Sequence, residues 1–256
     1  MNKNPEIQFR SPEEIKAYQE SRLAEELLYL QNHSRFYQHL FQAYHIDIQQ
    51  IKTIEDLQQI PVTTKTDLQL HNEDFICVSR DEIIDYVTTS GTLGDPVTFV
   101  LTSEDLDRLA YNEYLSFTTT GCSRQDILQL MTTIDRRFMA GLAYYMGARE
   151  LGMGVARVGN GIPELQWDTI RRIHPTCGMV VPSFLIKLIE FAEKNHIDYH
   201  HCSMQKCVCI GEALRNPDFT LNTQSKRIHE KLDSLHLYST YTSTDMQSSI
   251  TECNEF

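Results

Sequence analysis

From Asp81 onward, short β-rich runs alternate with helical segments, and this alternation constrains the fold more than any other feature of the sequence. Strands are predicted at residues 126–132, 154–158, 177–181, 206–210 and 235–239, with a helical pattern between each strand and the next. Strands separated by crossover helices pair in parallel, because the chain must return across the sheet before the next strand begins. The sequence therefore predicts an α/β fold with mostly parallel sheets flanked by helices.

The first 80 residues have a helical pattern. Ser11, Pro12 and Glu14 form a helix start, with Ser at the N-cap, Pro in the first turn and Glu three residues after the cap. A second short helix is predicted at residues 53–58, and Thr66 is predicted to cap the next helical turn. Because no linker interrupts the chain, we expect a single domain over residues 1–256. It would comprise a helical N-terminal arm (1–80) packed on an α/β core (81–256).

Charge and composition exclude several classes of function. The chain has 23 Lys and Arg against 35 Asp and Glu, a net charge of -12, which disfavours binding to nucleic acid or anionic membranes. No run approaches the ~20 apolar residues of a membrane span, and the polar first ten residues do not resemble a secretory signal. Seven cysteines, an odd number, favour reduced thiols and a cytoplasmic location.

The strongest local motif is Thr-Thr-Ser-Gly-Thr-Leu-Gly-Asp-Pro at residues 88–96. Glycines allow backbone N–H groups to converge on an anion, and the hydroxyl groups add further donors, so the segment suits the phosphates of a nucleotide. It is not the Lys-containing phosphate loop of P-loop proteins, because no Lys follows Gly94. The alternative interpretation is a solvated hairpin turn at residues 94–96.

Three motifs resemble conserved motifs of the adenylate-forming superfamily, which activates carboxylic acids with ATP. They are the segment at residues 88–96, Tyr-Thr-Ser-Thr-Asp at residues 241–245 and Ile-Gly-Glu-Ala-Leu at residues 210–214. Further segments resemble phenylacetate–coenzyme A ligases in particular: Ile-Pro-Val-Thr-Thr-Lys-Thr-Asp-Leu at 60–68, His-Ser-Arg-Phe-Tyr at 33–37 and Val-Pro-Ser-Phe at 181–184. The resemblance covers nearly the whole chain, and it implies the large N-terminal domain of an adenylate-forming enzyme.

The resemblance implies a reaction in two steps: a carboxylate and ATP form acyl-AMP, and coenzyme A then displaces AMP to give a thioester. Thr244 and Asp245 would be catalytic, with Asp245 holding Mg²⁺. An aryl or other hydrophobic carboxylate would contact Phe138, Ala140, Gly141 and Pro182, whereas Tyr144 is interpreted as core. The residues expected to bind ATP are Thr89, Ser90, Gly91, Thr92, Gly94, Gly211, Glu212, Ala213, Tyr241 and Thr242.

The sequence departs from the family pattern at several positions. Asp95 stands where the family often has Lys, Thr242 replaces a Gly, and Asp245 is one methylene shorter than the usual Glu. The ribose-binding Asp, the catalytic Lys and the C-terminal lid domain of the family lie beyond the motifs present here. We therefore expect this chain to be an N-terminal portion that does not complete the reaction alone.

Other interpretations stay open at this point. The enzyme could pass its acyl group to an acceptor other than coenzyme A, or the chain could be a nucleotide-binding module without chemistry. Cys207 and Cys209 fall on one face of a predicted strand and are interpreted as buried hydrophobic residues rather than zinc ligands. Cys253 is considered as a zinc ligand, and a homodimer is expected by resemblance only.

Overall fold

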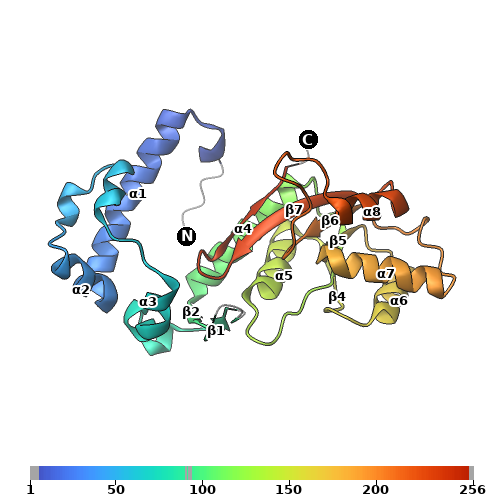
Figure 1. Ribbon diagram of the computed structural model, residues 1–256, viewed down its shortest axis with the longest axis horizontal. Coiled ribbons are helices and arrows are strands. Elements are labelled where there is room, and N and C mark those ends of the chain that lie inside the picture. The colour runs from blue at the N-terminus through green and yellow to red at the C-terminus, as the bar shows by residue number, and fades with distance from the viewer. Residues whose placement is uncertain (1–5, 90, 92–93, 254–256) are drawn as a thin grey trace. The chain divides into compact units, whose positions relative to one another are not determined.

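The computed structural model describes residues 6–89, 91 and 94–253 (Figure 1). The chain forms two compact units, Met1–Ser103 and Glu104–Phe256, and each is described by itself. The predicted single domain with its boundary after residue 80 stays a prediction. None of the helices in the described residues combines the length and the apolar character needed to span a bilayer.

The first unit consists mainly of helices. Its helices are α1 (Pro12–His33), α2 (Arg35–Ala43) and α3 (Lys65–Leu70), with 3-10 turns at Ile7–Phe9, Ile48–Gln50, Glu55–Gln59, Asn72–Phe75 and Arg80–Glu82. Leu27, Phe41 and Ile51 form a small buried core between α1, α2 and the following turn. Strands β1 (Asp85–Thr88) and β2 (Thr98–Leu101) pair antiparallel, and the predicted phosphate loop lies between them in the sequence.

Helix starts in this unit follow local capping chemistry. The predicted start at Ser11 is confirmed, because its hydroxyl accepts the backbone N–H of Glu14 at 3.3 Å. The prediction that Thr66 caps α3 is wrong. Thr64 is the cap: its Oγ1 accepts the backbone N–H of Asp67 at 3.2 Å, while the Asp67 carboxylate accepts the N–H of Thr64 at 2.8 Å. This reciprocal pair moves the start of α3 to Lys65.

The second unit is an α/β layer structure, as predicted. Its strands are β3 (Ile127–Leu130), β4 (Gly154–Arg157), β5 (Cys177–Val180), β6 (Lys206–Cys209), β7 (His236–Ser243) and β8 (Ser248–Thr251). They form one sheet in the order β4-β3-β5-β6-β7-β8, in which every neighbouring pair is parallel except β7 and β8. The predicted final strand at 235–239 is longer than expected and turns back into β8, which was not predicted.

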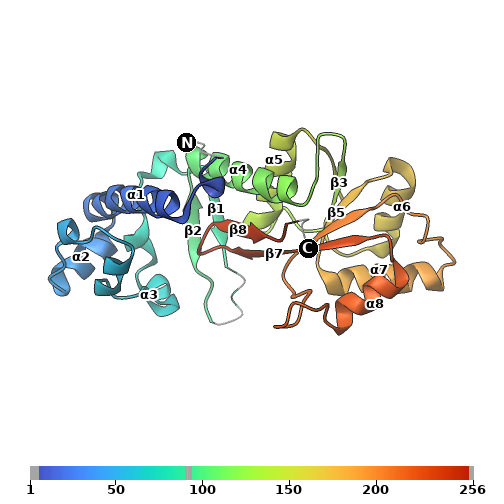
Figure 2. The same cartoon turned by 90° about the horizontal axis from the view of Figure 1, so that it is seen from above.

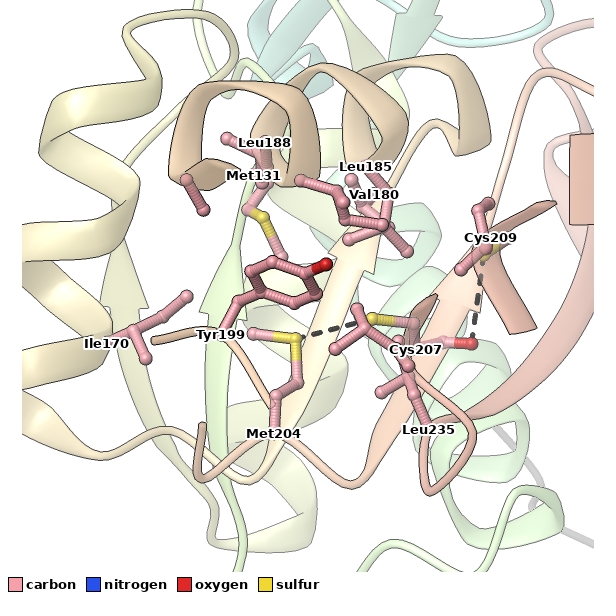
Figure 3. Packing of buried hydrophobic residues seen from close by; sticks show 14 of the residues in the cluster. Met131, Ile170, Val180, Leu185, Leu188, Tyr199, Met204, Cys207, Cys209 and Leu235 are labelled. Atoms are coloured by element: carbon pink, nitrogen blue, oxygen red, sulfur yellow. Dashed lines mark hydrogen bonds between the residues drawn. The ribbon is translucent and has the colours of Figure 1, made fainter. Parts of the chain in front are cut away.

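Helices cover both faces of this sheet (Figure 2). One face packs on α4 (Ser103–Thr119) and α5 (Met139–Leu151), and its core includes Phe117, Leu128 and Tyr144. The other face packs on α6 (Pro163–Ile173), α7 (Pro182–Lys194) and α8 (Thr223–Lys231). Figure 3 shows the core on this second face, where Cys207 and Cys209 lie among Met204, Val180 and Leu235. Both cysteines are fully buried, in line with the predicted hydrophobic role.

Candidate functional site

The strand order reverses between β3 and β5, because the crossover through α5 leads to one side of β3 and the crossover through α6 leads to the other. In open α/β sheets, ligands bind outside the carboxyl ends of the strands at such a reversal. Phe138 lies in the segment that follows β3, and Pro182 directly follows the end of β5 as the first residue of α7. The structure thus brings two of the predicted substrate residues to neighbouring strand ends.

Helix α5 approaches the segment after β3 very closely. A Cβ atom added at Gly141 would lie 1.8 Å from the carbonyl oxygen of Thr133, so only glycine fits at this position. Ala140 is buried beside it, Phe138 is 36% exposed, and Tyr144 is fully buried. Tyr144 therefore belongs to the core, as interpreted from the sequence, whereas Phe138 remains partly exposed at the N-cap of α5.

Glu212 connects the carboxyl ends of β5 and β6. Its carboxylate accepts the backbone N–H of Ser183 at 2.9 Å, the Ser183 hydroxyl at 2.7 Å and the Gln224 amide at 2.8 Å. Partial burial opposes ionisation of Glu212, but these donors outweigh burial and lower its pKa. The carboxylate thereby caps the Ser183 N–H in the first turn of α7, a role that Ser183 itself does not fill.

A hollow of about 930 Å³ lies between the loop that follows β6 and the second half of β7. Ala213 and Tyr241, which come from two of the sequence motifs, both line it, together with Phe219 and Ile250. Tyr241 is 67% exposed and Phe219 is 80% exposed. The hollow therefore offers a flat, partly aromatic lining of the kind that binds ring systems.

The ion pair between Arg215 and Glu252 lines the same hollow. Arg215 Nε donates to Glu252 Oε1 at 2.8 Å, and a second guanidinium nitrogen also contacts that oxygen. Glu252 Oε2 in turn accepts the backbone N–H of Ser239 on β7 at 3.0 Å. The pair ties the loop after β6 to the end of β8 and so supports the hollow from two strands.

The β7–β8 hairpin carries three more of the residues predicted in this unit. Thr242 lies on β7 on the opposite face from Tyr241, because successive side chains alternate along a strand. Thr244 and Asp245 follow in the turn, where Asp245 is exposed and accepts the Ser243 hydroxyl at 3.4 Å. The turn itself is held by Arg108 of α4, which donates to the backbone carbonyl of Gln247 at 2.7 Å.

Helix α4 holds the hairpin through further polar contacts. Asn112 Oδ1 accepts the backbone N–H of Ser249 at 2.7 Å and its hydroxyl at 2.9 Å, and Ser116 contacts Ser249 Oγ at 2.9 Å. Glu113 lies in the same layer and is only 3% exposed, and its Oε2 has no hydrogen-bond partner among the described residues. Burial raises the pKa of Glu113 to about 7, against the effect of the Ser249 and Ser116 hydroxyls.

The predicted phosphate loop belongs to the first unit. Thr89 is buried; its hydroxyl accepts the backbone N–H of Val97 at 3.0 Å and the Lys65 ammonium at 3.2 Å. Gly91 and Gly94 have φ angles of +70° and +112°, which favour glycine. Ser90 and Thr92, also predicted here, lie outside the described residues.

Lys65 is the residue that sequence reasoning missed. No Lys follows the glycines of the loop, yet the fold of the first unit places the Lys65 ammonium against Thr89 at the base of the loop. The capping pair Thr64–Asp67 makes Lys65 the first residue of α3, but the contact with Thr89, 24 residues further on, has no local signal in the sequence. A cation at this position suits an anionic ligand.

The described residues contain no group of three or more His, Cys, Asp or Glu side chains suited to a metal ion. For Mg²⁺ this does not conflict with the prediction, since Mg²⁺ is usually bound by one or two carboxylates together with substrate phosphates. The donors at Asp245 and Thr244 are hard oxygens of the required kind. Among the described residues, no group of metal ligands includes Cys253, so zinc binding there stays a prediction.

Comparison with solved structures defines the fold. A 2-hydroxyisobutyryl-CoA ligase, solved in an open conformation with 2-HIB-AMP and CoA, matches with a TM-score of 0.84 at 21% identity, over 95% of this chain and 57% of that chain. A long-chain-fatty-acid-CoA ligase from Archaeoglobus fulgidus matches with a TM-score of 0.54 at 18% identity, over 70% of this chain and 35% of that chain. The fold is thus that of adenylate-forming CoA ligases.

Sequence comparison narrows the class. The phenylacetate-coenzyme A ligase of Thermus thermophilus is 30% identical over 209 residues, 81% of this chain and 47% of the relative. That of Escherichia coli is 30% identical over 189 residues, 73% of this chain and 43% of the relative. The chain is therefore a homologue of phenylacetate–coenzyme A ligases, which confirms the resemblance seen in its motifs. It spans about half the length of these curated relatives. No protein-family model matches the sequence.

Proposed function

We propose that the protein acts in the ATP-dependent activation of a carboxylic acid, through an acyl-AMP intermediate to an acyl–coenzyme A thioester. The observation that carries this proposal is the hollow shared by Ala213 and Tyr241. Two motifs that the sequence singled out separately for nucleotide binding meet there, at the carboxyl edge of a parallel sheet. The homology to phenylacetate–coenzyme A ligases supports the same reaction.

We assign the base of the nucleotide to this hollow in the second unit. Separately, we propose that the loop after β1, in the first unit, binds phosphate. An exposed Tyr241 ring beside the small Ala213 side chain leaves room for a planar base to stack. In the loop, Gly91 and Gly94 permit close backbone approach, and the Lys65 ammonium supplies positive charge. This charge matters because the whole chain is acidic, at -12.

For the carboxylic acid we propose an aryl or other hydrophobic compound bound near the reversal of strand order. Phe138 and Pro182 flank this region, and the small residues Ala140 and Gly141 let the start of α5 pack closely on the segment after β3. Asp245, with Thr244, would hold Mg²⁺, which neutralises phosphate charge when bound. The homodimer and the cytoplasmic location stay predictions.

Equilibrium binding tests the nucleotide assignment. Isothermal titration of the 256-residue chain with ATP and Mg²⁺ is repeated with Tyr241→Ala and Lys65→Met. Loss of a charged hydrogen bond predicts a roughly tenfold weaker affinity for Lys65→Met. The exposed residues Tyr44 and Lys52 provide the matched controls Tyr44→Ala and Lys52→Met. Equal affinities for all four variants and the unsubstituted chain would reject the assignment.

Release of pyrophosphate, measured with and without the C-terminal half of a phenylacetate–coenzyme A ligase supplied in trans, separates the three functional alternatives. Turnover of ATP with phenylacetate, followed by thioester formation with coenzyme A, supports the proposal. Pyrophosphate release without use of coenzyme A would favour a different acyl acceptor, and ATP binding without pyrophosphate release would favour a non-catalytic nucleotide-binding module.

A further inference from the structure

Two buried cysteines on the α4 side of the sheet lie with their sulfur atoms in contact. Cys122 follows α4 in the turn that leads to β3, and Cys177 is the first residue of β5. Their Sγ atoms are 3.6 Å apart, and the side chains are buried in one core cluster, with Cys122 at 5% and Cys177 at 0% exposure. They lie at the amino-terminal end of the sheet, away from the carboxyl edge that carries the candidate site.

The turn before β3 is built so that Cys122 stays in this position. Its backbone N–H donates to the carbonyl of Phe117 at 2.9 Å, and Gly121 takes a φ of +71° to allow the reversal. The Lys206 ammonium, from β6, donates to the carbonyl of Gly121 at 2.6 Å. The sulfur of Cys122 is thus held against β5 from both the helix and the sheet.

The surroundings also favour reaction at Cys122. The hydrogen bond with the Cys177 thiol is the main cause that lowers the pKa of Cys122, and Lys206 acts in the same direction. The same contact and complete burial raise the pKa of Cys177. One sulfur is therefore the better nucleophile, and the other remains a protonated thiol beside it.

We propose that Cys122 and Cys177 form a disulfide when the folded protein meets a peroxide. The Cys122 thiolate attacks one oxygen of hydrogen peroxide, the O–O bond breaks, and a sulfenic acid and hydroxide result. The Cys177 thiol then displaces the sulfenic oxygen as water, and its proton leaves with that oxygen. In sum, two thiols and one peroxide give one disulfide and two waters, so the thiols are oxidised and the peroxide is reduced.

The other buried cysteines do not share this arrangement. Cys207 has its sulfur 3.3 Å from the thioether of Met204, which cannot form a disulfide with it. Cys209 lies two residues further along the same strand, and its thiol contacts the carbonyl of Cys207. Oxidation of the native protein should therefore select the pair 122–177.

Peptide mapping tests the linkage in the unsubstituted protein. Trypsin releases residues 109–124 and 173–187, and each of these peptides contains a single cysteine. After treatment of the native protein with peroxide and alkylation in denaturant, we expect a linked pair of these peptides. The number of alkylated thiols should fall from seven to five. Sulfinic acid at Cys122 without a link, or a link that joins other cysteines, would overturn the proposal.

Variants add a second measurement. Cys122→Ala should abolish the loss of two thiols, whereas Cys209→Ala, at an equally buried position, should leave the link intact. The oxidised protein should also unfold several degrees higher than its reduced form, because the link closes a long loop in the unfolded chain. Trp167, the only tryptophan, lies in the same unit and reports this shift. An unchanged unfolding temperature together with an intact thiol count would reject the linkage.

Discussion

Replacing Glu113 by Gln should stabilise the second unit at pH 8, and this stabilisation should be much smaller at pH 5. Burial raises the pKa of this carboxyl from an ordinary 4.5 to about 7. A raised pKa means that stability is fully present below 4.5 and is lost as the pH rises toward 7, since the folded state must then bury a charge. The Gln side chain has a similar shape and stays neutral throughout.

The magnitude follows from the two pKa values of the same group. They differ by about 2.5 pH units, and each unit corresponds to about 1.36 kcal/mol, so ionisation costs the folded state about 3 kcal/mol. Solvent screens little of this, because Glu113 is only 3% exposed. Most of the loss falls between pH 5 and pH 8, so the stability gap between Glu113→Gln and the parent should widen by about 2 to 3 kcal/mol over that interval.

Urea unfolding followed by Trp167 fluorescence measures this gap, because Trp167 is the only tryptophan and lies in the core of the second unit. Comparing the two proteins at each pH removes the contribution of the other titrating groups. Glu230→Gln, at an exposed position on α8, serves as the control and should show no such widening. A gap for Glu113→Gln that is equal at pH 5 and pH 8 would refute the reasoning.

Further substitutions test single contacts. Gly141→Ala should destabilise the second unit by about 3 kcal/mol or more, because its Cβ would lie 1.8 Å from the Thr133 carbonyl; the urea midpoint measures this. Asn112→Ala should cost about 1 to 3 kcal/mol and speed hydrogen exchange in β8, since Ser249 loses its partner. Glu212→Gln should lower thermal stability at pH 7 by about 1 kcal/mol. Because the pKa of Glu212 is lowered, this difference should vanish in acid, when the parent carboxylate is also neutral.

The sequence was sufficient to predict the α/β class and the parallel pairing, because each strand and helix in the second unit has its own apolar pattern. It was not sufficient for β8. Residues 248–251 are polar except for Ile250, and they form a strand only because β7 pairs with them and Asn112 accepts from the backbone of Ser249. A strand held by partners distant in sequence has no local signature.

The sequence was likewise insufficient to predict all contacts of the candidate site. Two of the motifs contain Ala213 and Tyr241, which line one hollow, and their positions beside strand ends are a local property of the sequence. The motifs did not predict that Lys65 reaches Thr89, or that Glu212 binds Ser183, because both contacts join segments more than 20 residues apart. Thr66 was chosen as a cap from residue type alone, whereas the reciprocal bonds of Thr64 and Asp67 decide the helix start.

The contacts of Glu212 also refine its expected role. Its carboxylate is already engaged by the N–H and hydroxyl of Ser183 and by Gln224, so it has little capacity left for a ligand. Its negative charge would also repel phosphates. The next residue, Ala213, lines the hollow instead. We therefore expect Glu212 to contribute to nucleotide binding by anchoring the loop to the start of α7. The backbone and Ala213 would then provide the contact surface, and the anchor would link the proposed base site at β6 to the proposed acyl site at β5.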